Sequence, residues 1–566
     1  MQATLALLFA LAAFLPLVGA AAMPSQARTS SPSRPDIIVI QTDDQGAASV
    51  RVMPNVRRLL GEEGATFEQA LAAIPLESPA LATLLSGRYA HGHGPLDERS
   101  SPRDLGSAGG FDLLPSWLGQ AGYYTAYVGR YLAGYGAREP RAIPAGWDEW
   151  YVPVGGFIHR YLGYALNENG ALVRYGTGDD AYLTDVLAAK AAAVVARRAA
   201  FPQPLFLWVS FLAPRAGLPS AGRLPETPLP ATRHQGRFAS EALPLPPSFN
   251  EHDVSDKPAW VQRRPLLGPG EIARVTQTYR LRLESLLAVD EGVASILSAL
   301  ATAGRLDRAW IVFTSLTGFL SGEHRIPRGK GVPYEEATRV PLLVRGPGVV
   351  GGLRLSQPVS AVDLAPSLLD MAGLPPRKGL DGRSLLPLLA DPGLRYGRDL
   401  LVEGPVRDGP APAFAALRTP RLAYVEYATG ERELYDLARD PSELRSLHAD
   451  PARAPLVEAF SRRLERLRRC SGSACLVGPA LSLFARAVGP CSSLLARATL
   501  GGPDARWLRR VAFFLSGRRV AVDSQPPFQV VTRLPAQGGR VRALALLLDG
   551  REVTRDRELP PCLGRR

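Results

Sequence analysis

The chain has 566 residues, of which 46% are hydrophobic and 21% are charged, so it has enough apolar material for a large folded core and is not a disordered chain. Its formal charge of +13 comes mainly from arginines scattered along the sequence, since the lysines are only Lys190, Lys257, Lys330 and Lys378. No basic run is interleaved with aromatic residues, so we expect no nucleic-acid partner.

The N-terminus contains an apolar stretch, from about residue 3 to residue 22, that ends in small residues. This pattern predicts a signal peptide over residues 1–22 and a Ser-, Pro- and Arg-rich linker over residues 23–34, and hence a secreted or cell-envelope protein. The stretch has no Lys or Arg before it and is nearly long enough to span a bilayer, so an uncleaved anchor is the alternative. We expect contact with a membrane only in that case.

Residues 35–400 alternate short apolar runs with helical patterns. Runs such as "DIIVIQ", "PLFLWVSFLA" and "AWIVFTS" predict strands, and "LTDVLAAKAAAVVARRAA" predicts a helix. The alternation predicts an α/β domain with a mostly parallel sheet flanked by helices, and the continuous apolar strands predict burial on both faces of that sheet. A Pro-rich interval between residues 202 and 269 is expected to be a long surface excursion.

Two smaller units are predicted after residue 400. Residues 401–469 contain "RLAYVEYATGERELYDLARDP", which is typical of a hairpin with Gly430 at its turn and predicts a small α+β subdomain closed by a helix. Residues 505–562 alternate short strands with turns, as in a small immunoglobulin-like β-sandwich module. Residues 470–504 are expected to be a cysteine-containing linker.

All cysteines lie in the last hundred residues: Cys470, Cys475, Cys491 and Cys562. This usage favours an oxidising compartment and disulfide bonds. Three connectivities are open, and we prefer Cys470 with Cys475 and Cys491 with Cys562 because this choice pairs near neighbours. Oxidation is then expected to cross-link only the region after Arg469.

Several motifs occur in a characteristic order: "RPDIIVIQTDDQ", "LLSGRYAHGHG", "GYYTAYVGRYLAGYG", "GWDEWYVPVGG", "GKGVPYEEATRVPLLVRGPGV" and "ELYDLARDPSEL". On these motifs the chain resembles the sulfatase family of the alkaline phosphatase superfamily, and is most similar to the N-acetylglucosamine-6-sulfatase and bacterial arylsulfatase branch. The resemblance covers roughly residues 35 to 450 and implies the sulfatase fold. It also implies sulfuric ester hydrolysis, with calcium bound at the carboxyl ends of the sheet strands.

The resemblance assigns one half of a metal site and finds the other half replaced. Asp43 and Asp44 in "QTDDQ" match the family's first pair of ligands, which are hard oxygen donors suited to calcium. The second pair is Asp-Asn in the family, whereas Leu316 and Thr317 occupy those positions here. Because calcium requires about six oxygens, we expect no cofactor or a weakly bound divalent metal.

The nucleophile position is also changed. Family members carry a cysteine or serine that becomes formylglycine at the start of a helix, and the spacing from Pro75 to Gly87 places Glu77 at that position. Glu77 cannot become formylglycine, and Leu81 replaces the arginine of the motif. A carboxylate nucleophile is chemically allowed but would need electrostatic support.

The supporting basic groups are partly exchanged. The resemblance implies a lysine, a histidine and a second lysine, and the sequence has Arg130, Arg215 and Lys330 there. Arginine does not release its proton near neutral pH and cannot act as the general acid. The remaining histidines of these motifs, His91, His93 and His324, are expected to be structural.

Two functions remain in competition. The first is an exported sulfatase-fold protein that is catalytically impaired, in which Asp43, Asp44 and Glu77 form a metal-free salt-bridge cluster with the three basic residues. The second is an active sulfate- or phosphate-ester hydrolase with a rebuilt site. In either case we expect a sulfated sugar or another anionic ligand, and a cell-envelope or protein partner for residues 505–562.

Overall fold

The structure is a computed structural model that describes residues 34–94, 113–218, 227–404, 410–489 and 493–561. The predicted signal peptide or anchor, Cys491 and Cys562 lie outside these ranges. Among the described residues one helix, α7 (Pro269–Thr302), is long and apolar enough to cross a membrane. More than half of its most apolar part is buried inside the protein, as in the core helix of a globular domain.

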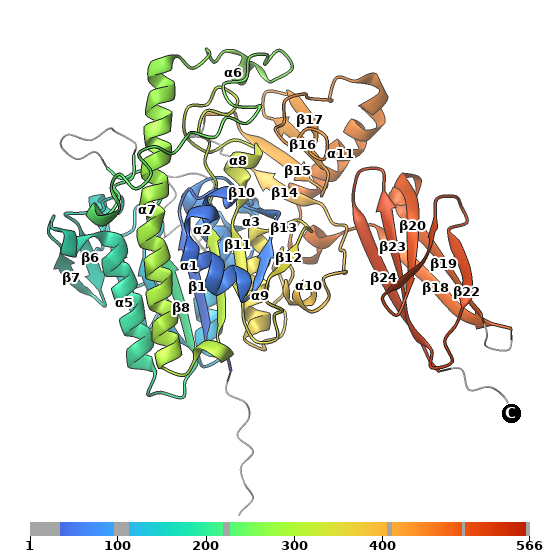
Figure 1. Cartoon of the computed structure of the whole chain (residues 1–566), viewed down its shortest axis with the longest axis horizontal. Coiled ribbons are helices and arrows are strands. Elements are labelled where there is room, and N and C mark those ends of the chain that lie inside the picture. The colour runs from blue at the N-terminus through green and yellow to red at the C-terminus, as the bar shows by residue number, and fades with distance from the viewer. Residues whose placement is uncertain (1–33, 95–112, 219–226, 405–409, 490–492, 562–566) are drawn as a thin grey trace, which may run out of the picture. The chain divides into compact units, whose positions relative to one another are not determined.

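A ten-stranded sheet forms the centre of the large domain (Figure 1). In spatial order its strands are β12 (Leu353–Leu355), β2 (Ala65–Phe67), β11 (Leu342–Arg345), β9 (Trp310–Ser315), β1 (Ile37–Thr42), β8 (Leu205–Ser210), β4 (Tyr124–Gly129), β5 (Glu149–Pro153), β6 (Ala165–Glu168) and β7 (Ala171–Arg174). The five strands from β9 to β5 run parallel, and antiparallel strands flank them. The predicted fold class is confirmed.

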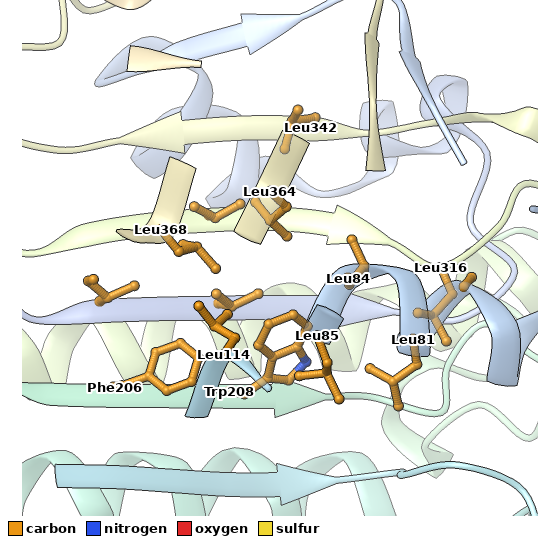
Figure 2. Packing of buried hydrophobic residues seen from close by; sticks show 14 of the residues in the cluster. Leu81, Leu84, Leu85, Leu114, Phe206, Trp208, Leu316, Leu342, Leu364 and Leu368 are labelled. Atoms are coloured by element: carbon orange, nitrogen blue, oxygen red, sulfur yellow. The ribbon is translucent and has the colours of Figure 1, made fainter. Parts of the chain in front are cut away.

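Strand β1 shows why the sheet is covered on both sides. Its side chains alternate between two hydrophobic clusters, with Ile37 and Val39 in one and Ile38 and Ile40 in the other. Helices α5 (Leu183–Arg198) and α7 cover the second face and pack against each other (Figure 1). Helices α2 (Glu77–Ser86), α4 (Leu114–Gln120) and α9 (Leu364–Met371) cover the first, where leucines pack on Phe206 and Trp208 (Figure 2).

The other α-helices before residue 400 are short: α1 (Pro54–Val56), α3 (Ala90–His93), α6 (Ala259–Gln262), α8 (Glu335–Thr338) and α10 (Leu386–Ala390). A three-stranded sheet of β10 (Arg339–Val340), β3 (Ala70–Leu71) and β13 (Val359–Ser360) lies outside the main sheet. Apart from β8, the described part of the Pro-rich interval contains only α6 and one 3-10 turn, Thr232–His234.

A four-stranded antiparallel sheet follows residue 399 and consists of β14 (Leu400–Glu403), β15 (Phe414–Arg418), β16 (Leu422–Tyr427) and β17 (Arg432–Asp436). Gly430 forms the β16–β17 turn with a φ of 86°, a conformation that favours glycine. Helix α11 (Ala454–Leu467) packs on this sheet through Phe460 and Tyr424.

The Cys470–Cys475 disulfide is present, which confirms one of the two preferred pairings. Both cysteines are buried in the hydrophobic cluster that also contains Phe460 and Tyr424. The bridge therefore belongs to the core of the subdomain formed by the four-stranded sheet and α11. Both bridged cysteines follow Arg469, as expected, but they pack against residues that precede it. Which part of the molecule reduction destabilises stays a prediction.

The C-terminal residues form two antiparallel sheets around one hydrophobic cluster. One contains β18 (Ala480–Val488), β19 (Ser493–Gly501) and β22 (Gln529–Arg533), and the other contains β21 (Arg518–Asp523), β20 (Leu508–Leu515), β23 (Gly539–Leu547) and β24 (Glu552–Leu559). β18 and β19 lie in residues 470–504, which the sequence predicted as a linker. Alternate burial of Leu481, Leu483 and Ala485 marks the strand, but small alanines weaken that signal in the sequence.

Buried ion pairs connect α11 with the C-terminal sheets. Arg463 of α11 pairs with Asp399 and also, at 2.8 Å, with Asp549 in the turn after β23. Arg551 donates to the same Asp549 carboxylate at 2.7 Å and pairs with Asp504. We call these residues the Arg463 network.

Candidate functional site

Five elements bring the predicted site residues together. Asp43 and Asp44 follow β1, Arg130 follows β4, Arg215 comes five residues after β8, Leu316 and Thr317 follow β9, and Glu77 is the first residue of α2. The carboxyl ends of parallel strands meet at one edge of a sheet, which is where open α/β folds collect their ligands. Lys330 reaches the same place from the loop before α8.

Local backbone geometry fixes two of these positions. Asp44 has a φ of 65°, a left-handed conformation that aspartate tolerates better than most residues. Gly129 has a φ of 118°, and a Cβ there would lie 2.0 Å from the carbonyl oxygen of Ser210. Only glycine therefore lets β4 end this close to β8, and the amide of Arg130 donates to that carbonyl at 2.9 Å.

Glu77 is almost fully buried and is surrounded by basic groups. Arg130 and Arg215 both form ion pairs with its carboxylate. Lys330 Nζ lies 3.4 Å from Oε2, and His159 Nε2 lies 3.5 Å from Oε1. At the first position of a helix the carboxylate is also favoured by the helix dipole. Glu77, which the resemblance puts at the formylglycine position, is thus held by charged contacts.

The two aspartates share the same basic groups. Asp43 lies 3.3 Å from Arg130 and 3.6 Å from Arg215, and Asp44 lies 2.5 Å from Lys330 Nζ. Burial alone would raise the pKa of Asp44, but the charges of Lys330, Arg215 and Arg282 outweigh it and hold this pKa well below its usual range. We call the six residues Asp43, Asp44, Glu77, Arg130, Arg215 and Lys330 the charge cluster.

Thr317 and Leu316 complete the site without supplying the family's ligands. The Thr317 hydroxyl donates to Asp44 Oδ1 at 2.9 Å, so it is a hydrogen-bond partner of one family ligand. Leu316 is buried with Leu81 in the same hydrophobic cluster (Figure 2). Two carboxylates that are already paired with cations, one leucine and one donating hydroxyl do not provide the oxygens that calcium requires. The residues present do not fit the family's metal.

Two residues of the site were not found from the sequence. Arg282 extends from α7, donates to the main-chain oxygens of Asp44 and Pro214, and lies over the Phe319 ring at 3.8 Å. Its burial lowers its pKa to about 10. His159 lies beside Glu77, and burial, together with the charges of Arg130 and Lys330, lowers its pKa to about 3. The sequence does offer one signal for Arg282, because a charged arginine stands there within the apolar part of a predicted helix.

The three histidines predicted to be structural contact residues outside the charge cluster. His91 contacts Glu403 through Nδ1 and the Cys470 carbonyl through Nε2, each at 2.9 Å. His93 contacts the Thr83 hydroxyl at 3.0 Å. His324 is fully buried, stacks on Tyr334 and contacts Glu251.

The family profile described as sulfatase matches residues 35–374, and a profile described as N-sulphoglucosamine sulphohydrolase, C-terminal, matches residues 322–470. The chain belongs to the sulfatase family. Among its relatives is an arylsulfatase of Volvox carteri, which is 30% identical over 81% of this chain and 78% of its own length. The human N-acetylglucosamine-6-sulfatase is 29% identical over 78% of this chain and 86% of its own length.

Further relatives and solved structures agree with this assignment. An extracellular sulfatase SULF-1 homologue of Drosophila melanogaster is 35% identical over 63% of this chain, but the match covers only 31% of that protein. A solved structure described as a complex with its substrate D-glucosamine-2-N,6-O-disulfate superposes with a TM-score of 0.64 and 25% identity, covering 77% of this chain and 98% of that one. This sulfatase-family protein therefore shares both sequence and fold with enzymes that act on sulfate esters.

Proposed function

We propose that this protein is an exported member of the sulfatase family that does not hydrolyse sulfate esters by the formylglycine mechanism. The observation that carries the proposal is the ion pairing of Glu77, at the formylglycine position, with Arg130 and Arg215. Glu77 is too buried and too strongly paired to attack sulfur. The general-acid position holds Arg215, which does not release its proton near neutral pH.

Export is supported by the predicted signal peptide, by the Cys470–Cys475 bridge and by relatives that are described as extracellular.

An anionic ligand is supported by the charges of the site residues. Three carboxylates face Arg130, Arg215 and Lys330, and Arg282 adds a fourth cation. We infer that the protein retains a sulfated sugar or a related anion as a ligand without cleaving it, and that residues 505–562 contact the cell envelope or a protein partner.

The activity assay tests the first part of this proposal. Purified full-length protein is incubated with 4-nitrocatechol sulfate and with bis-p-nitrophenyl phosphate, each with added calcium, manganese or zinc. We expect no turnover above that of buffer with either substrate. Turnover that disappears in the Asp43→Asn variant would instead show an active hydrolase with a rebuilt site, and Glu241→Gln, a change at an exposed ion pair, is the matched control.

A further inference from the structure

A second group of ionisable side chains lies buried outside the charge cluster. One ring nitrogen of His324 and one carboxylate oxygen each from Glu336 and Glu443 lie within 4.8 Å of one another. His324 is in the loop after β9, Glu336 is in α8, and Glu443 is in the loop after β17. The group therefore joins the large domain to the subdomain built on β14–β17.

The orientation of His324 can be read from its hydrogen bonds. Its Nδ1 lies 2.8 Å from Glu251 Oε2, and the imidazole ring stacks on Tyr334 with the ring centres 4.0 Å apart. His324 is fully buried, and its Nε2 has no hydrogen-bond partner among the residues that the structure describes. A histidine that donates one nitrogen to a carboxylate and presents the other to a cation is the usual arrangement around a bound metal.

The cations that lie near this group are paired with other carboxylates. Arg418 and Lys257 enter the region, but Arg418 pairs with Glu335 and Lys257 pairs with Glu251 and Asp256. One Glu336 oxygen, Oε2, is also buried without a hydrogen-bond partner among the described residues.

We propose that His324, Glu336 and Glu443 bind one divalent transition-metal ion of the zinc type. Two carboxylates balance its charge, and a neutral imidazole selects zinc, manganese or cobalt over calcium and magnesium, which prefer oxygen ligands. Glu251 orients the histidine ring from outside the ligand set. The ion would be structural, because it connects three separate segments of the chain at a buried position.

Metal titration of the full-length protein tests the proposal. The protein is stripped with a chelator, dialysed and titrated with zinc chloride by calorimetry, and cobalt is used in parallel for its visible absorption. We expect one ion per chain and a rise in melting temperature. Glu336→Gln should weaken zinc binding at least about tenfold, whereas Glu335→Gln, one residue away and paired with Arg418, should bind within about twofold of the unchanged protein.

A second comparison separates this site from the family's metal position. Asp43→Asn combined with Asp44→Asn should leave zinc affinity unchanged. If that double variant loses the ion, or if Glu336→Gln keeps it, or if none of zinc, manganese and cobalt binds, the proposal is wrong. Should Glu336→Gln fail to fold by circular dichroism, Glu443→Gln is judged by the same criteria.

Discussion

Two carboxylates that are largely shielded from solvent, those of Glu77 and Glu403, have partners of different kinds. In the charge cluster, Glu77 pairs with two guanidinium groups, those of Arg130 and Arg215. In the contact around His91, the partner of Glu403 is an imidazole, and the other nitrogen of the same ring contacts the carbonyl of Cys470 in the disulfide.

The two contacts differ in how strongly they should depend on solution conditions. Burial by itself would lower the pKa of His91, but its hydrogen bond to Glu403 outweighs burial and raises this pKa to about 9. The contact around His91 therefore depends on pH, and its neighbour, the disulfide, depends on the redox state. The six residues of the charge cluster include no histidine and no cysteine, so the cluster lacks both of these sensitive groups.

The largest expected effect is the loss of Glu77. Glu77→Ala leaves the buried Arg130 and the partly buried Arg215 without their shared partner, so we expect the free energy of unfolding to fall by about 3–5 kcal/mol. Guanidinium denaturation at several pH values measures it, and the loss should be the same from pH 6 to pH 9. Glu241→Ala, at the exposed pair with Arg51, should cost less than about 1 kcal/mol. Equal losses in the two variants would contradict the cluster's role.

The second effect is a pH dependence that comes from His91. Because the folded state raises the pKa of His91 from 6.5 to about 9, its stabilisation is fully present below pH 6.5 and is lost as the pH rises through 9. The size is about 3 kcal/mol, since one pKa unit corresponds to about 1.4 kcal/mol. His91→Gln should remove this slope in denaturation curves between pH 6 and pH 10, while His252→Gln, at an exposed position, should retain it. An unchanged slope in His91→Gln would refute the assignment.

The smallest effect concerns the disulfide beside this contact. Cys470 and Cys475 are five residues apart and close a short loop, so the bridge should contribute about 2 kcal/mol by restricting the unfolded chain. Replacing both cysteines by serine should lower the stability of the subdomain that contains α11, because the bridge is buried in its core. The hydrogen-exchange rates of the backbone amides in β15 and β16 show whether this subdomain is destabilised, and we expect them to rise. Faster exchange confined to β18–β24 would show that the bridge supports the C-terminal sheets instead.

Much of the fold could be predicted from the sequence because its signals are local. The uninterrupted apolar run of β1 predicts burial on both faces, and Gly430 predicts the β16–β17 turn. Strands β18 and β19 were missed because alanines at inward positions, such as Ala485 and Ala496, make their alternation weak. The nearby cysteines favoured the prediction of a linker.

The residues of the site also fall into two groups, those that sequence motifs predict and those that only the fold brings together. The family motifs place Asp43, Asp44 and Glu77 in one register, and their spacing is enough to predict that they lie together. Arg282 enters from the middle of a helix far along the chain, and only the packing of α7 against the sheet brings it to Asp44. The partners of His324 come from two loops and a short helix, so no sequence spacing connects them.

The Arg463 network has a consequence for how this protein can be shortened or recombined. Asp549 supplies a buried acceptor to Arg463, and its main-chain oxygen accepts a hydrogen bond from the hydroxyl of Thr419, in the turn between β15 and β16. A chain truncated before residue 480 would retain Asp399 beside Arg463. It would lose Asp549, which now accepts hydrogen bonds from both Arg463 and Thr419. A replacement C-terminal module would therefore have to bring an acidic turn to the same place.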